Sequence, residues 1–554
     1  MLNAAQKAYQ AYKKIMGKWS PFTAVTTSEL NVIYNARLRF DKDEKFRSEA
    51  LALETEEGES LDLLIDKYFV AYNNRHGLDI RKTLVEFDNP ELAGGNYFII
   101  KAYVNGEEAD PTTLKAGDEV RIVSTLYSYE SDTPLTVPEI ALELVGDEYQ
   151  ALTKSVKDAS KIDFEVSLKN PGHIRFKLFA RDNEGKNIIG SEGGFGGLLF
   201  SKEEIKPTHA LPADFKDFWR SEIDKMLRHD HLGTTPDGYE GAVRYDYDMP
   251  KKNFYSILKV DEQFIDKMRA NLLPSPEYSD LERYDIYRVY LKSPGPCHSS
   301  GFITIPKGAA AKSLPMHFVF DGYGVYSAEP ILNPQRITVH CTHHGYELGE
   351  HRDNYYVPLN QTVCHFYGRG INEVNAGYDD ISDCYMTYLL IRDLQMVHFA
   401  TTPELCGDVK GLCEAYSGKA IISGGSMGGY QAICIGGLVT LLNEKATPIE
   451  IEKIIPNIPA FCNIAGHTEG RVKTYLTTYV DGVDYYDAAQ FARLINSHVE
   501  IGRIGLGDDT CPAGGIIAMT NALGGSFDVN ILQNSSHGFI PDERFQNWYK
   551  YSKS

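Results

Sequence analysis

The stretch Gly424-Gly425-Ser426-Met427-Gly428-Gly429 decides the fold, because it sets a serine between small residues in a sharp turn. Ala420-Ile421-Ile422 precedes it with the composition of a buried strand, and an apolar helix is predicted over 430–438. A strand, a tight turn and a helix in this order lift the serine hydroxyl above the end of a sheet, at the positive end of the helix dipole. The pattern predicts a nucleophile at Ser426. The alternative is an ordinary glycine-rich turn.

A serine hydroxyl is a weak nucleophile and needs a base, which an acid orients in turn. A strand is predicted over 499–506, and Asp508 follows its end; His537 follows the last apolar strand, in a loop of small residues. Active sites of open α/β sheets lie at these carboxyl ends of strands, so both side chains should lie near the serine. The predicted catalytic triad is Ser426, Asp508 and His537. Asp509 is the alternative acid, and a plain solvent-facing loop histidine is the alternative for His537.

The tetrahedral intermediate of such a reaction carries an oxyanion, which needs two N–H donors. The backbone N–H of Met427, directly after the nucleophile, is the first predicted donor. A strand ending at Phe320 is followed by Asp321-Gly322-Tyr323-Gly324, and the N–H of Tyr323 is the second candidate. The alternative for this loop is an ordinary glycine turn.

The segment His340-Cys341-Thr342-His343-His344 invites a zinc hypothesis, because histidine and cysteine are zinc ligands. It lacks the C-x₂-C and H-E-x-x-H spacings of known zinc motifs. We expect these residues to line the catalytic mouth, and the sequence predicts neither a metal nor a cofactor.

The chain divides near Lys206-Pro207. After this point apolar strand-length runs alternate with helical segments, which predicts a parallel sheet with crossover helices over 206–554. Helices are predicted over 378–401 and 511–523. This region holds the whole predicted triad, so we expect residues 1–205 to influence substrate choice more than chemistry.

The N-terminal part has a different pattern. Apolar and polar residues alternate over 162–168 and 174–178 on either side of a turn, which predicts a hairpin in a β-sandwich-like domain over 96–205. Residues 1–95 have no assigned fold, although an amphipathic helix at the start and a strand over 31–40 are expected. Gly193–Gly197 lacks the features of a phosphate loop and is expected to be a flexible join or a bulged strand.

Composition restricts the function classes. The 554 residues hold 56 Lys and Arg against 76 Asp and Glu, a net charge of −20. So acidic a chain is not expected to bind nucleic acid or an anionic membrane, and no apolar run is long enough to span a bilayer. The nine cysteines, all from Cys297 onward, have no framework spacing and predict reduced thiols in the cytoplasm. Secretion stays an alternative, because cleavage of a signal peptide would leave the same composition.

In their order, these motifs resemble the acetyl xylan esterase and cephalosporin-C deacetylase family of α/β-hydrolases over about residues 211–538. The matching segments are Leu211–Phe215 with Phe218-Trp219, Gly301–Pro306, Asp321–Gly324, Gly424–Gly429, Tyr486–Ala492, and Gly505–Asp508 with Cys511-Pro512. The resemblance implies an α/β-hydrolase catalytic domain, preceded here by a β-rich, sandwich-like N-terminal region. It also places the acid of the family on Asp508 and its base on His537.

The sequence departs from the family at the mouth of the site. Asp321 stands where the family usually has histidine, and Met427 where it usually has glutamine. The Arg-Gly-Gln signature is missing, and His344-Gly345-Tyr346 is a better equivalent by strand order than Arg369-Gly370-Ile371. The predicted substrate-binding residues are Asp321, His344 and Tyr346.

The leading hypothesis for function is therefore a serine carbohydrate esterase. It would remove acetyl groups from xylan-type oligosaccharides through an acyl-enzyme, with an acylated carbohydrate as its partner. A feruloyl or general carboxylesterase is the alternative within enzymes, and a catalytically inactive carbohydrate-binding protein is the alternative from another class. The sequence is also compatible with a homo-oligomer.

Overall fold

A computed structural model describes residues 44–53, 96–538 and 546–554, with internal gaps at 129–130, 132, 190–193, 230–254, 272, 294–298, 325–327, 343–347, 351–373, 375–376, 378–379 and 475–478. Seven positions before residue 41 are also described, at 5, 6, 8, 9, 12, 36 and 40. All seven are helical, and the five between residues 5 and 12 agree with the helix expected at the start of the chain. The strand expected over 31–40 is wrong at Ala36 and Phe40, which lie four residues apart, on one face of a helix.

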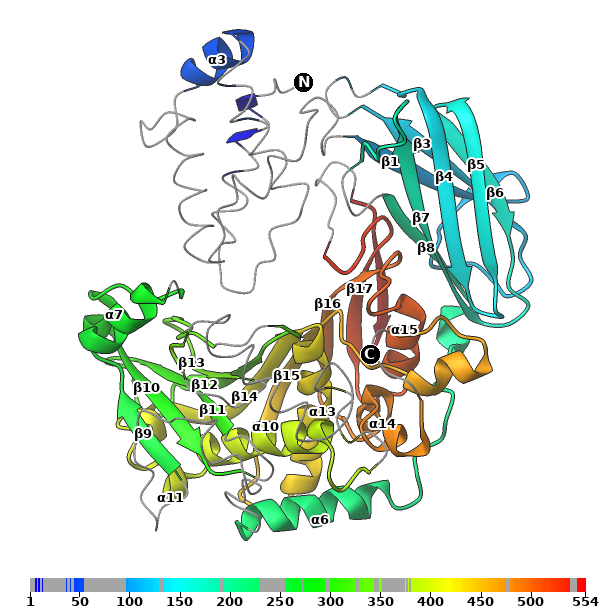
Figure 1. Ribbon diagram of the computed structural model, residues 1–554. Helices are drawn as coiled ribbons and strands as arrows, with labels where there is room; N and C mark the ends of the chain where they lie inside the picture. The colour runs from blue at the N-terminus through cyan, green and yellow to red at the C-terminus, as the bar shows by residue number, and fades with distance from the viewer. Residues whose placement is uncertain are drawn as a thin grey trace.

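Residues 97–200 form two four-stranded antiparallel sheets, which we call the double sheet (Figure 1). The first sheet has the order β2 (Glu107–Ala109), β1 (Tyr97–Val104), β3 (Val120–Tyr127), β6 (Lys161–Val166). The second has the order β5 (Ala151–Ala159), β4 (Val137–Gly146), β7 (Gly172–Arg181), β8 (Gly194–Phe200).

One apolar core lies between these two sheets and holds them together. Phe164 of β6 meets Phe176 of β7 edge to face, with ring centroids 5.3 Å apart. Both rings are buried in a cluster that draws its members from both sheets. Every second residue of β6 and β7 points into this cluster, which is why their sequences alternate between apolar and polar. The glycine-rich segment at Gly194 is part of strand β8.

The remainder of the chain builds a ten-stranded sheet with helices around it. The strand order is β18-β17-β16-β15-β14-β12-β13-β11-β10-β9. The strands are β9 (Tyr255–Lys259), β10 (Tyr284–Leu291), β11 (Ser299–Pro306), β12 (Leu314–Phe320), β13 (Ile337–Cys341), β14 (Tyr416–Gly425), β15 (Glu450–Asn457), β16 (Val499–Gly505), β17 (Phe527–Leu532) and β18 (Trp548–Lys553). Pairing is parallel from β13 through β12 and β14 to β17 and antiparallel at both edges. This is an α/β fold.

The described helices are α3 (Glu44–Leu51), α6 (Phe215–Leu227), α7 (Glu262–Ala270), α8 (Asp280–Arg283), α10 (Tyr385–Thr401), α11 (Pro403–Cys406), α12 (Leu412–Ala415), α13 (Met427–Leu442), α14 (Ala488–Ala492) and α15 (Ala513–Asn521). Short 3₁₀ turns cover η1 (Lys202–Glu204), η4 (Ile464–Glu469) and η5 (Asp481–Tyr485). Helix α13 packs on β14 and β15, and α10 packs on α13. Helix α10 begins later than predicted, because the Cys384 side chain caps it by accepting a hydrogen bond from Thr387 N. No helix in the described part of the chain is long and apolar enough to cross a membrane.

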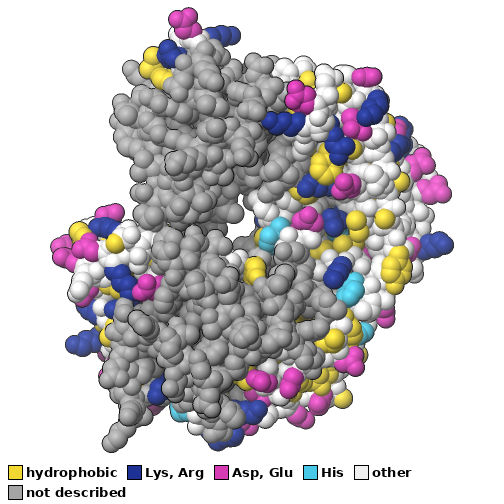
Figure 2. Space-filling model, viewed as in Figure 1, with side chains coloured by type: hydrophobic (Ala, Val, Ile, Leu, Met, Phe, Trp, Pro, Cys, Tyr) yellow, Lys and Arg dark blue, Asp and Glu magenta, His cyan; other side chains and the backbone are white. Residues whose placement is uncertain are grey.

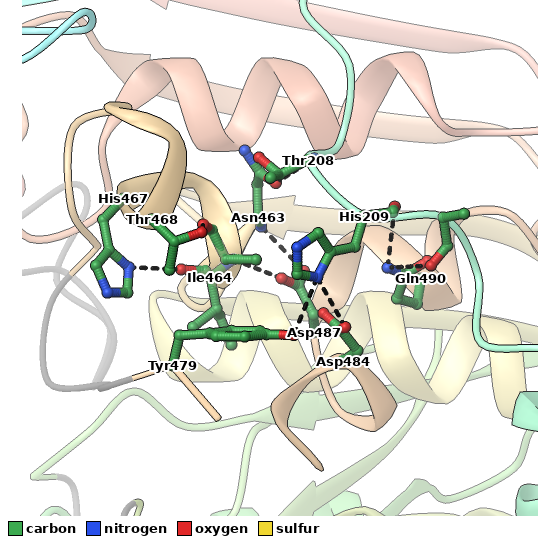
Figure 3. Close-up of polar contacts among 12 residues, drawn as sticks. Thr208, His209, Asn463, Ile464, His467, Thr468, Tyr479, Asp484, Asp487 and Gln490 are labelled. Atoms are coloured by element: carbon green, nitrogen blue, oxygen red, sulfur yellow. Dashed lines mark hydrogen bonds and ion pairs between the residues drawn. The ribbon is translucent and has the colours of Figure 1, made fainter. Parts of the chain in front are cut away.

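The segment that leaves the double sheet is fixed to the α/β region by polar contacts (Figure 3). Thr208 N donates to Asn463 Oδ1 over 2.7 Å. The His209 Nδ1 atom lies 2.9 Å from Asp484 Oδ2 and 3.0 Å from the Tyr479 hydroxyl, which itself donates to Asp484. These contacts hold the connection between the two parts of the protein in one place.

Charge is mixed on the face of the double sheet shown in Figure 2, where acidic and basic side chains are interspersed. Arg121 and Lys154 both lie near Asp163, at 2.7 Å and 3.9 Å between charged atoms.

A buried carboxyl in α10 leads to a prediction for stability. Asp393 is 1% exposed and accepts a 2.8 Å hydrogen bond from the Gln431 side chain of α13. Burial raises the pKa of Asp393 to about 8, whereas an unfolded aspartate titrates near pH ~4. The folded protein thus binds an extra proton between about pH 4 and about pH 8, and stability from this group is lost as pH rises through that window.

We expect Asp393→Asn to remove this loss, because asparagine stays neutral and still offers Gln431 an acceptor. The free energy of unfolding, measured in urea at about pH 5 and about pH 8, checks this. Relative to wild type, the variant should become more stable by up to ~4 kcal/mol at the higher pH. A difference that stays constant between the two pH values would contradict a protonated Asp393.

Candidate active site

The turn at Ser426 joins β14 to α13 and holds its backbone in an unusual conformation. Ser426 has φ 58° and ψ −117°, a region that side-chain-bearing residues rarely adopt and that marks stored strain. A Cβ on Gly428 would lie 2.1 Å from Phe320 O, and one on Gly424 would lie 2.4 Å from the Gly428 backbone. Only glycine fits at these two positions, which explains the small residues on either side of the serine.

The three predicted triad residues meet at the carboxyl ends of β14, β16 and β17. His537 Nε2 lies 2.9 Å from Ser426 Oγ, and His537 Nδ1 lies 2.9 Å from Asp508 Oδ2. An ionised carboxylate only accepts, so Nδ1 carries the proton and Nε2 is left to accept from the serine hydroxyl. The imidazole is therefore in the tautomer that a general base for Ser426 requires.

The carboxylate of Asp508 is held by two backbone N–H groups. Its side chain is 0% exposed, and its Oδ1 accepts hydrogen bonds of 2.8 Å from the backbone N–H groups of Thr510 and Cys511. Asp509 is exposed to solvent and makes none of these contacts. The structure thus brings Asp508, and not Asp509, to the histidine.

Arg503 is a residue of this site that the sequence analysis missed. Its guanidinium donates to Ser535 Oγ over 2.7 Å, to Ser536 O over 2.9 Å and to His537 O over 2.8 Å. It therefore clamps the loop that carries the histidine to the neighbouring strand β16. An arginine in the second half of a strand that leads to the catalytic acid was the available signal, because a half-buried charge there must find partners.

The predicted oxyanion donors lie at the same edge of the sheet. Met427 is the first residue of α13, and its side chain is 0% exposed and packs in the core. The loop after β12 passes close to the nucleophile, because a Cβ on Gly322 would lie 3.7 Å from Ser426 Cβ. Tyr323 follows at 38% exposure. The assignment of Met427 N–H and Tyr323 N–H stays a prediction.

The side chain of Asp321 is buried, which argues against its predicted role in binding substrate. Its side chain is 0% exposed, and its Oδ1 lies 2.9 Å from His340 Nε2. Burial raises the pKa of the Asp321 carboxyl, and His340 beside it opposes the rise. The buried pair lies at the start of the Gly322 loop. His340 is therefore a core residue and does not line the entrance of the active site, contrary to what the sequence had led us to expect. His344 and Tyr346 lie outside the described residues.

Within the described residues, a metal could be held by Asp508, Cys511 and His537, whose ligand atoms lie within 4.8 Å of one another. Two of these groups already bond each other in the triad, so a bound ion would displace the proton that links them. Burial raises the pKa of the Cys511 thiol, which disfavours the thiolate that metals bind. The set fits proton transfer better than metal binding.

Comparison with known proteins shows which enzymes the chain resembles. No family model matches it. The acetyl esterase Axe7A of Xylanibacter ruminicola is 24% identical over 416 residues, which cover 72% of this chain and 78% of the relative. This similarity supports a carboxylic ester hydrolase that resembles the acetyl esterase over most of its length. The family resemblance drawn from the motifs and the prediction of an ester hydrolase are thereby confirmed.

Two solved acetyl xylan esterases show similarity to this esterase-like chain. The enzyme from Paenibacillus sp. R4 matches with a TM-score of 0.41 and 17% identity, over 61% of this chain and 94% of that one. Acetyl xylan esterase 1 from Thermoanaerobacterium sp. JW/SL YS485 matches with a TM-score of 0.41 and 16% identity, over 62% of this chain and 94% of that one.

The geometry predicts different effects for two adjacent carboxylates. Asp508→Asn should lower kcat for an activated acetate ester by about 10²–10⁴-fold, because the amide cannot hold the Nδ1–H tautomer. Asp509→Asn, the matched control, should change kcat by no more than about twofold, because that side chain is exposed and does not contact His537. Steady-state kinetics of the two purified variants tests this assignment. A larger loss of kcat in Asp509→Asn than in Asp508→Asn would show that Asp509 is the catalytic acid.

Proposed function

We propose that this protein is a serine carbohydrate esterase that hydrolyses acetyl esters on xylan-type oligosaccharides through an acyl-enzyme. The observation that carries the proposal is the pair of 2.9 Å contacts that His537 makes to Ser426 and to the buried Asp508. A binding protein has no use for a strained serine, an oriented imidazole and a buried carboxylate held in one line.

The proposed mechanism follows from the positions of these atoms. Ser426 Oγ attacks the acetyl carbonyl carbon while His537 Nε2 takes its proton, and the Asp508 carboxylate stabilises the resulting imidazolium. The N–H groups of Met427 and Tyr323 stabilise the oxyanion. His537 then returns the proton to the sugar oxygen as the ester bond breaks, which leaves acetyl on Ser426. A water molecule in the place of the departed sugar then gives a proton to His537 Nε2 and attacks the acetyl carbon. The bond to Ser426 Oγ breaks, His537 returns the proton to Oγ, and acetate is released.

We further propose a division of the chain into three parts. Residues 1–95 form an N-terminal region of unassigned fold, 96–205 a sandwich-like domain and 206–554 an α/β-hydrolase catalytic domain. Separate apolar cores support the second boundary: one lies within the double sheet, and another spans the α/β region.

Acetyl should be preferred over feruloyl as the acyl group. The curated relative is an acetyl esterase, and Met427 is packed in the core, where it cannot easily move aside for a large aromatic acyl group. We expect kcat/KM for acetylated xylo-oligosaccharides to exceed that for methyl ferulate by more than about 10²-fold, since one pocket methylene alone is worth about 10–200-fold.

The experiment compares both substrates on wild type and on Ser426→Ala. The variant should lose about 10⁴–10⁶-fold in kcat on the acetyl ester with its fold intact. Retention of a tenth of wild-type activity by Ser426→Ala would overturn the serine mechanism. A kcat/KM on methyl ferulate equal to or above that on the acetyl ester would identify a feruloyl esterase instead, with the same serine mechanism.

A further inference from the structure

The turn that carries Asp508 rests directly on the double sheet. A Cβ on Gly197 of β8 would lie 2.2 Å from Leu506 O, and a Cβ on Gly507 would lie 2.8 Å from Gly196 N. The backbones of β8 and of this turn therefore lie in direct contact, and the Cβ of Phe195 would lie 2.5 Å from a Cβ on Gly507. In Figure 1 the double sheet lies beside α15, β16 and β17, which is the part of the α/β region that supplies the acid and the base.

A buried histidine completes this contact. His173 of β7 is 0% exposed, and its Nε2 lies 2.9 Å from Leu506 O. A carbonyl only accepts, so the imidazole donates. Burial lowers the pKa of His173, which keeps the ring neutral. Its own backbone N–H donates to Asp147 over 3.0 Å, so the ring is anchored within the double sheet.

A third group of contacts locks the two parts together near the same place. Asp147 forms a 2.8 Å ion pair with Arg471 and accepts a 2.8 Å hydrogen bond from Val472 N, both from the α/β region. Arg175, two residues after His173, interacts electrostatically with Asp508 and Asp509. The 506–508 turn is thus held by backbone contact and by the His173 hydrogen bond, while Asp147 fixes the double sheet to the separate segment at Arg471 and Val472.

We propose that two residues of the double sheet, Gly197 and His173, hold the 506–508 turn in the position in which Asp508 meets His537. Both are positioning residues, and their role rests on the triad proposed above. The sequence led us to expect that residues 1–205 affect substrate choice more than chemistry. The contacts favour the opposite, because they reach the turn that carries the acid of the triad.

The proposal gives the glycines of β8 different roles, which supplies a matched control. Gly197→Ala would push the acid turn away, whereas the Cβ of Gly194→Ala would meet Phe98 Cδ2 at 2.6 Å, inside the core of the double sheet. Both variants crowd the same strand, but only the first touches Leu506. A displacement of about 1 Å at a catalytic group can cost about 10²-fold in rate.

The experiment measures kcat, KM and thermal midpoint on an activated acetate ester for Gly197→Ala, Gly194→Ala, His173→Leu, His173→Gln and Ser426→Ala in the full chain. Gly197→Ala and His173→Leu should lower kcat by about 10-fold to 10²-fold with KM changed by less than about threefold. His173→Gln should recover most of the rate, because its Nε2 amide can still donate to Leu506 O. Gly194→Ala should keep a near wild-type kcat.

The outcomes separate this inference from the proposed function. Wild-type kcat in His173→Leu and Gly197→Ala, beside an inactive Ser426→Ala, would overturn the positioning role and leave the triad intact. An equal loss of kcat in Gly194→Ala would also overturn it, since crowding alone would then explain the effect. Activity in Ser426→Ala would refute the triad itself. If Gly197→Ala fails to fold, the His173→Leu and His173→Gln pair decides.

Discussion

The turn at Ser426 requires two backbone segments to approach each other with no side chain between them. Gly428 lies so close to Phe320 O that a Cβ would stand 2.1 Å away. That contact fixes the start of α13 against the end of β12, and it thereby aligns the nucleophile with the Gly322 loop. The positive φ of Ser426 follows from the same contact, since the chain must reverse within one residue before α13 begins.

Around this turn, each remaining group of the site is held by a different element. Arg503 of β16 holds the His537 loop through three hydrogen bonds, and Asp508 is held by two backbone N–H groups. The double sheet adds a further support under the acid turn through His173. A site that is supported from three directions needs little reorganisation during reaction, which is how preorganised polar groups lower a barrier.

Sequence patterns could predict the parts of the site that local rules control. The glycines around Ser426, and a polar residue after each of two apolar strands, followed from turn sterics and strand order, and the structure brings those three side chains together. Patterns could not predict His173, because its partner is 333 residues away and no local rule encodes that distance. Asp321 was misjudged for the same reason, since its partner His340 sits on the neighbouring strand. At Ala36 and Phe40 the alternating pattern was weak, and the helical spacing prevailed.

The central claim is that Ser426 is an activated nucleophile. The most direct test is labelling with a fluorophosphonate, which phosphonylates activated serines, followed by intact-mass measurement and peptide mapping. We expect one adduct per chain, on the peptide that contains Ser426, with loss of esterase activity in proportion to labelling and no adduct in Ser426→Ala. Loss of activity with the adduct on another residue, and Ser426 unmodified, would contradict the account.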